Sequence, residues 1–270
     1  MTAHFRRDVA DGVLTITLTR DDKRNAIDFE MWAALETAVD DLATDHSLGV
    51  LVITGEGRYF TSGMDIMTLT PNPGMGDDGV LRGSQTRRVY RSNAHHDFFD
   101  RIEQVEKPII LAAQNHCFGV GVEMGASCDF RFAADVTTFS LPEIANLSAL
   151  PASGGMSRLT RLIGPHWTKW IAMAGETIDA QQALAMGFVH AVYPAAEFSE
   201  KVQAFAKRLA SSHREALGLA KLAIDTATEV DRRTARDFDR LSQTLLFHSP
   251  EFQARVKAFG ERSANKPASS

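Results

Sequence analysis

The chain has 270 residues, of which 44% are hydrophobic and 23% charged, a composition typical of a globular protein with a large apolar core. Its formal net charge of −5 and pI near 6.0 argue against nucleic acid or an anionic membrane surface as a partner. No apolar run approaches the roughly 18 residues of a membrane span, and the first eight residues lack the apolar region of a secretory signal. Because there are only two cysteines, Cys117 and Cys128, we expect a reducing, cytoplasmic location and no disulfide framework.

The N-terminal part of the chain predicts strands and one helix. Apolar and polar residues alternate on both sides of Asp11-Gly12, which predicts a β-hairpin formed by Phe5–Val9 and Val13–Thr19. Asp28 can cap a helix that runs to about His46, because apolar residues follow it at helical spacing. Further elements follow in order: a buried strand at Val50–Thr54, a glycine-bearing turn at Gly55–Asp65, a loop at Thr70–Gly83 that we expect to be mobile, and a helix at Gln85–Val105.

The second half of the chain changes from strands to helices. Strands are predicted at Ile109–Ala113, Phe130–Ala133, Thr138–Leu141 and Val189–Tyr193, with a helical pattern beginning at Ser157. Residues 196–262 carry no strand pattern. We therefore predict an α/β protein with a core domain over residues 1–195, a helical C-terminal region over 196–262 and a frayed tail over 263–270.

The glycine turn at Gly119–Gly121 is the most informative local feature. It follows the apolar Ile109–Ala113 strand and leads into a predicted helix that contains Glu123. Free main-chain N–H groups at the start of a helix can bind an oxyanion. A second carboxylate, Glu143, follows twenty residues later. A turn that can polarise a carbonyl, with two candidate acid/base glutamates, points to chemistry on an acyl group.

Several ordered motifs resemble the crotonase family, which comprises enoyl-CoA hydratases, isomerases and relatives that act on coenzyme A thioesters. The motifs follow one another over roughly residues 8 to 262, and their order carries more weight than any one of them. They are Phe60–Ile66, Lys107–Ile110, Gly119–Glu123, Cys128–Arg131, Leu141–Ile144, Pro151–Gly155, Arg158-Leu159, Ala174–Glu176, Ala183–Gly187 and Val189.

The resemblance implies a fold, an assembly and a reaction. The implied fold is a spiral of repeated ββα units with a helical C-terminal region, assembled as a trimer or a hexamer. The implied oxyanion hole consists of the main-chain N–H groups of Ser62 and Val120. Glu143 would donate a proton to the α-carbon while Glu123 positions the water, which makes the chain an enoyl-CoA hydratase with no metal and no cofactor other than the coenzyme A of its substrate.

The resemblance also assigns substrate-binding residues and leaves alternatives open. Residues implied to contact the acyl-CoA are Lys23, Arg24, Thr61, Met64, Asp65, Phe259 and Arg262. The Gly119-Val120-Gly121 turn replaces a run of three glycines, and the interval from Glu143 to Pro151 is one residue longer than in the hydratases. The alternatives are therefore a double-bond isomerase that uses Glu143 alone and a non-catalytic coenzyme A-binding or oligomeric scaffold of the same fold.

Overall fold

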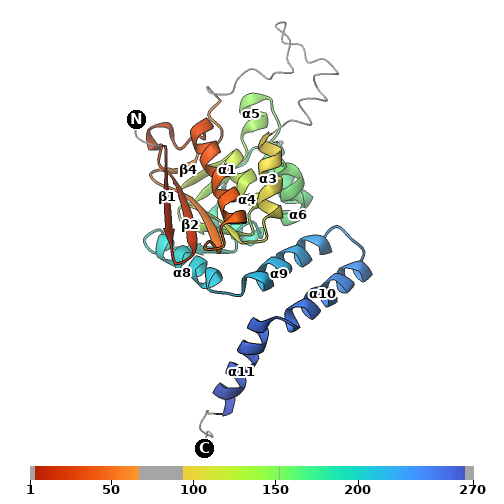
Figure 1. Ribbon diagram of the computed structural model, residues 1–270. Helices are drawn as coiled ribbons and strands as arrows, with labels where there is room; N and C mark the ends of the chain where they lie inside the picture. The colour runs from red at the N-terminus through yellow and green to blue at the C-terminus, as the bar shows by residue number, and fades with distance from the viewer. Residues whose placement is uncertain (1–3, 67–93, 152, 265–270) are drawn as a thin grey trace, which may run out of the picture. The chain divides into compact units, whose positions relative to one another are not determined.

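The computed structural model describes residues 4–66, 94–151 and 153–264, and the predicted Thr70–Gly83 loop lies outside these ranges. By their contacts, residues divide into two units, Met1–Ser211 and Ser212–Ser270. The first unit contains two sheets and the helices that cover them (Figure 1). No helix within the described ranges is long and apolar enough to cross a membrane.

The six-stranded sheet has the order β1-β2-β3-β5-β7-β10. The predicted hairpin is confirmed: β1 and β2 pair antiparallel across Asp11-Gly12, and both turn residues have the positive φ that a tight hairpin turn requires. Every other pairing in this sheet is parallel. Its strands are β1 (Phe5–Ala10), β2 (Val13–Leu18), β3 (Val50–Gly55), β5 (Ile109–Ala113), β7 (Phe130–Ala134) and β10 (Ala191–Tyr193).

A second sheet of four short strands has the order β4-β6-β8-β9. Its strands are β4 (Tyr59–Thr61), β6 (His116–Phe118), β8 (Thr138–Ser140) and β9 (Ile178–Asp179). In each of the consecutive pairs β3–β4, β5–β6 and β7–β8, the first strand belongs to the large sheet and the second to the small sheet. Helices follow the second and third of these pairs, which confirms the repeated ββα spiral.

Helices cover both faces of the large sheet. Alternate residues of β3 point to opposite faces: Leu51 and Ile53 join the core that includes α1, while Val50 and Val52 join the core beneath α8. Both faces are buried, so the central strands have the continuous apolar sequence expected of a parallel sheet. The helices of the first unit are α1 (Phe29–Thr44), α3 (Ala94–Gln104), α4 (Val120–Ser127), α5 (Glu143–Leu147), α6 (Gly155–Thr168), α7 (Ala180–Ala185) and α8 (Phe198–Ala210), with a 3-10 turn η1 (Asp21–Lys23) and a π-helical turn η2 (Lys169–Met173).

The helical C-terminal region begins later than residue 196 when it is defined by contacts. The first helix after that residue, α8, packs on the large sheet through Phe198, Val202 and Ala206, so it belongs to the first unit. The second unit consists of α9 (Arg214–Ala227), α10 (Arg232–Phe247) and α11 (Pro250–Ala264). Large apolar side chains of this unit are exposed, including Leu241, Leu245 and Phe259.

Candidate active site

Three neighbouring strands of the small sheet end at one edge, and each end carries a segment of the candidate site. Strands β4, β6 and β8 are parallel neighbours, so their carboxyl ends meet at the same edge. Ser62–Asp65 follows β4, Gly119–Val120 follows β6, and Leu141–Glu143 follows β8. The Gly119 N–H donates to Ser140 O at 2.9 Å, which joins the ends of β6 and β8. The topology therefore assembles segments that lie about eighty residues apart in sequence.

The turns after β4 and β6 touch each other at two glycines. Gly119 has φ +57° and ψ −126°, a conformation that favours glycine. A Cβ added at Gly119 would lie 3.4 Å from Gly63 Cα and 3.0 Å from Glu143 Oε1. A Cβ added at Gly63 would lie 4.0 Å from the Val120 nitrogen. The absence of side chains at these two positions lets the turns and the Glu143 carboxyl come together.

Val120 has the geometry of an oxyanion donor. It is the first residue of α4, and its N–H has no acceptor among the described residues. The N–H groups of Val122 and Glu123 already donate to Gly119 O, at 2.9 and 3.3 Å. The Val120 side chain leaves this N–H available, because a side chain attached at Cα does not use the backbone donor.

Ser62 is not the second donor, because its N–H donates to Arg24 O at 3.0 Å. The better candidate is Met64. Met64 and Ile27 form a parallel β-bridge whose two hydrogen bonds are made by the neighbours of Met64 and not by Met64 itself. The Ile27 N–H donates to Gly63 O, and the Asp65 N–H donates to Ile27 O. The N–H of a residue at the centre of such a bridge points away from the partner strand. Within the described chain nothing accepts from the Met64 N–H.

Glu123 lies in the first turn of α4 and is 4% exposed. Its Oε1 accepts the N–H groups of Ser153 at 2.8 Å and of Gly155 at 3.3 Å. Burial raises the pKa of Glu123 to about 7, and the nearby Glu143 carboxyl adds to the rise. The two backbone donors and the Arg158 charge act in the opposite direction. Near neutral pH this carboxyl is therefore divided between its acid and base forms.

Glu143 begins α5 and is half-buried. Burial also raises the pKa of this carboxyl above its ordinary value. Its Oε2 is buried and has no hydrogen-bond partner in the part of the chain that the structure describes. A buried carboxyl oxygen without a partner is rare and points to a group that completes its bonding with a ligand or water. Glu143 therefore lies beside the two touching turns with one oxygen available.

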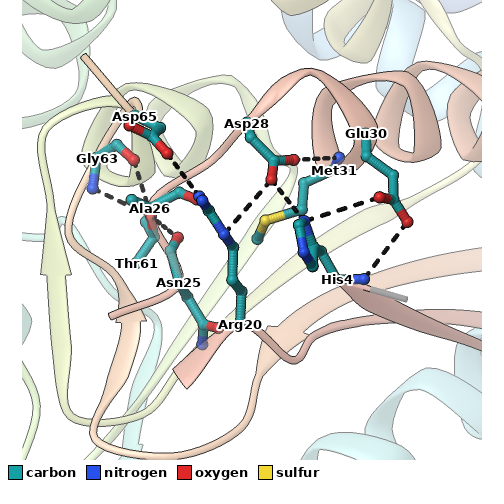
Figure 2. Close-up of polar contacts among 10 residues, drawn as sticks. All are labelled: His4, Arg20, Asn25, Ala26, Asp28, Glu30, Met31, Thr61, Gly63 and Asp65. Carbon is teal, nitrogen blue, oxygen red and sulfur yellow. Dashed lines mark hydrogen bonds and ion pairs between the residues drawn. The ribbon is translucent and has the colours of Figure 1, made fainter. Parts of the chain in front are cut away.

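Apart from Met64, the predicted substrate-binding residues lie on three segments: the turn at η1, strand β4 with the turn after it, and helix α11. Lys23 and Arg24 are exposed on the turn that begins at η1. Thr61 is wrong as a direct ligand contact, because it is fully buried and its hydroxyl donates to Asn25 O at 2.7 Å and accepts from Gly63 N (Figure 2). The Asp65 carboxylate is used internally, in an ion pair with Arg20 at 2.7 Å.

Phe259 and Arg262 lie in α11 of the second unit. The Phe259 side chain is 70% exposed, whereas the side chain of Arg262 lies outside what the structure describes. Their proposed contact with coenzyme A stays a prediction.

Sequence reasoning missed the backbone groups that hold Glu123. The signal was present, because Pro151–Gly155 is one of the ordered motifs, but it carried no assigned role. A Cβ added at Gly155 would lie only 2.7 Å from Glu123 Cγ, so glycine at this position allows the carboxyl to reach its donors.

The spiral fold brings an oxyanion-type turn and two candidate acid/base glutamates to one edge of the small sheet, an arrangement suited to chemistry on an acyl group. A profile of the enoyl-CoA hydratase/isomerase family matches residues 8–267, and the chain belongs to this family. The chain is 31% identical over 247 residues to the 2,3-dehydroadipyl-CoA hydratase of Escherichia coli K12, with 92% of this chain and 91% of the relative covered. It is 30% identical to the crotonyl-CoA hydratase of Syntrophomonas wolfei, with 92% of each chain covered. The crystal structure of an enoyl-CoA hydratase from Bacillus anthracis superimposes with a TM-score of 0.84 at 28% identity, covering 96% of each chain.

Proposed function

We propose that this protein is an enoyl-CoA hydratase that adds water across the double bond of a 2-enoyl-CoA thioester. The observation that carries the proposal is the placement of two carboxyls at one oxyanion turn: Glu143, with an unpaired oxygen beside Gly119, and the buried Glu123. The hydratase names of full-length relatives support it. Hydration is not a redox reaction, so the proposed chemistry requires no cofactor beyond the coenzyme A carried by the substrate.

The proposed reaction uses each group once. The N–H groups of Met64 and Val120 bind the thioester oxygen and stabilise the enolate, each donor contributing about 3–4 kcal/mol by comparison with known oxyanion holes. Glu123 accepts a hydrogen bond from water and directs its oxygen at the β-carbon. Glu143 gives its proton to the α-carbon. The proton lost by the water returns to the glutamate pair, so the pair ends the cycle with the proton count it started with.

Burial raises the pKa of both carboxyls, which supports a site that can hold a proton near neutral pH. Glu143 has to be protonated to act as the acid, and burial favours its neutral form. Two nearby carboxyls in a partly dry site do not both ionise readily, so the pair titrates as a unit. An enzyme that works near neutral pH then keeps one proton on the pair.

The proposal is tested by following the loss of enoyl thioester absorbance with a panel of acyl chains. Glu123→Gln and Glu143→Gln should each lower kcat by about 10²–10⁴. An isomerase would instead lose activity in Glu143→Gln and keep it in Glu123→Gln. If both variants keep near-full hydratase activity, the acid/base assignment is wrong. A wild-type protein that binds acyl-CoA without converting any of the panel would point to the scaffold alternative.

The setting of the enzyme completes the proposal. We place it in the cytoplasm because both cysteines, Cys117 and Cys128, are free thiols. We propose a homotrimer or a hexamer because exposed apolar side chains in the second unit, such as Phe247 and Val256, need a covering surface. The exposed Lys23 and Arg24 are the proposed contacts of the coenzyme A phosphates.

A further inference from the structure

A short segment, Arg24–Asp28, is bonded along its length to the turn that carries Met64. Besides the bonds of Ser62 to Arg24 and of Ile27 to Gly63 and Asp65, the Thr61 hydroxyl donates to Asn25 O. We call Arg24–Asp28 the strap. The position of the Met64 N–H therefore depends on the position of the strap.

Arg20 lies between the strap and the Met64 turn and bonds to both. Its Nη1 donates to Ala26 O at 3.0 Å and to Asp65 Oδ2 at 2.7 Å (Figure 2). The two side chains are largely buried, with 13% of Arg20 and 12% of Asp65 exposed. Asp65 is the residue next to Met64, so one guanidinium joins the strap directly to the proposed donor.

The other side of the guanidinium is anchored at the end of the strap, where α1 begins. Arg20 Nε lies 3.5 Å from Asp28 Oδ2. Asp28 is itself held, because its Oδ1 caps α1 by accepting the Met31 N–H at 3.0 Å and its Oδ2 lies 2.6 Å from His4 Nδ1. The guanidinium is thus fixed on one side by the start of α1 and holds the Met64 turn on the other.

We infer that Arg20 is a positioning residue for the Met64 half of the oxyanion hole, and that its ion pair with Asp65 sets the direction of the Met64 N–H. The inference rests on the proposed acyl thioester function. A partly buried ion pair adds little net stability, since desolvation offsets its attraction. The planar guanidinium instead fixes geometry, because its donors point in set directions that a lysine ammonium does not reproduce. A displacement of about 1 Å in a catalytic group is enough to lower a rate by about 100-fold.

The test uses Arg20→Lys and Asp65→Asn, which break the pair from its two sides while keeping side-chain size nearly constant. Arg7→Lys is the matched control, because Arg7 forms an ion pair of similar length with Asp41, at 2.8 Å, on the exposed surface. Three properties are measured for each: kcat on an enoyl-CoA, the absorbance shift of a bound chromophoric aryl-enoyl-CoA, and the affinity for free coenzyme A. The absorbance shift reports polarisation of the thioester carbonyl, which free coenzyme A lacks.

Both site variants should lose about 10- to 100-fold in kcat and much of the absorbance shift, with coenzyme A affinity within about twofold of the wild type. The control should match the wild type in all three. Unchanged kcat and absorbance shift in both variants would overturn the inference, as would a loss of coenzyme A affinity equal to the loss of rate. If Arg20→Lys does not fold, Asp65→Asn alone decides.

Failure of the proposed function gives a different result. A wild-type protein that shifts the chromophore but hydrates no enoyl-CoA would refute the hydratase assignment, while the Arg20 inference would still be decided by the shift in the variants. A wild type that binds the chromophore with no shift would refute the oxyanion hole and this inference together.

Discussion

The raised pKa of Glu123 predicts a measurable dependence of stability on pH. Burial raises this pKa from 4.5 to about 7. At about 1.4 kcal/mol per pH unit, the folded protein is destabilised by about 3 kcal/mol when Glu123 must ionise. The residue is 4% exposed, so solvent screening reduces this figure little.

The sign follows from proton binding in the two states. Between pH 4.5 and 7 the folded protein keeps the Glu123 proton, whereas the unfolded chain has lost it. The free energy of unfolding therefore falls as pH rises through this range and levels off above pH 7. Glutamine carries no charge at any pH, and its Oε1 can still accept the N–H groups of Ser153 and Gly155. Glu123→Gln should remove this dependence.

The measurement is urea unfolding of wild type and Glu123→Gln at matched protein concentrations. The stability of the wild type relative to the variant should fall by about 2 kcal/mol between about pH 5 and about pH 8. Groups that titrate alike in both proteins cancel in this comparison, and Glu200→Gln, which removes an exposed carboxylate of α8, controls for the loss of one charge. A difference that stays constant to within about 0.5 kcal/mol across this range would refute the reasoning.

Three further predictions concern packing and assembly. Gly155→Ala should lower kcat at least about tenfold, because the added Cβ would lie 2.8 Å from Glu123 Oε1 and displace that oxygen. At Gly260 an added Cβ would have no atom within 4 Å. Gly260→Ala should therefore leave the free energy of unfolding unchanged or raise it by up to about 1 kcal/mol. Equal activity of the Gly155 variant and wild type would contradict this. Arg131→Met should cost about 3 kcal/mol or more in urea unfolding, since the buried guanidinium donates to the carbonyls of Phe188, Gly125 and Cys128, and a loss below about 1 kcal/mol would be inconsistent with that role. Light scattering should give three or six times the chain mass of 29.6 kDa, and a stable monomer at micromolar concentration would disprove the assembly.

The secondary structure was largely predictable because it depends on local patterns. Asp11-Gly12 formed the expected hairpin turn, and Asp28 caps α1 as its residue type predicts. The strands β4, β6 and β9 were missed, because two or three residues are too few to show an alternating pattern, and β4 lies within the segment predicted as a turn. The sequence also did not show that the C-terminal unit begins at Ser212 and not at residue 196. Helix α8 has the same kind of sequence pattern as the helices after it and differs only in packing on the large sheet.

The sequence also singled out Glu123, Glu143 and the turn at Val120 as site candidates, because a glycine turn before a helix and two carboxylates are visible as residue types in order. It could not decide which N–H is free. Ser62 and Met64 are two residues apart on one turn, and only the pairing of that turn with the strap uses the Ser62 N–H and leaves the Met64 N–H.

Side-chain roles that depend on neighbours distant in sequence were decided by the tertiary structure alone. The pKa of Glu123 is set by burial and by Glu143, and its oxygen is held by backbone donors thirty residues away. Asp65 was expected to bind substrate and is instead paired with Arg20, which lies forty-five residues earlier. Residue types determine which groups can donate, accept or ionise, whereas burial and the competition between possible partners exist only after the chain has folded.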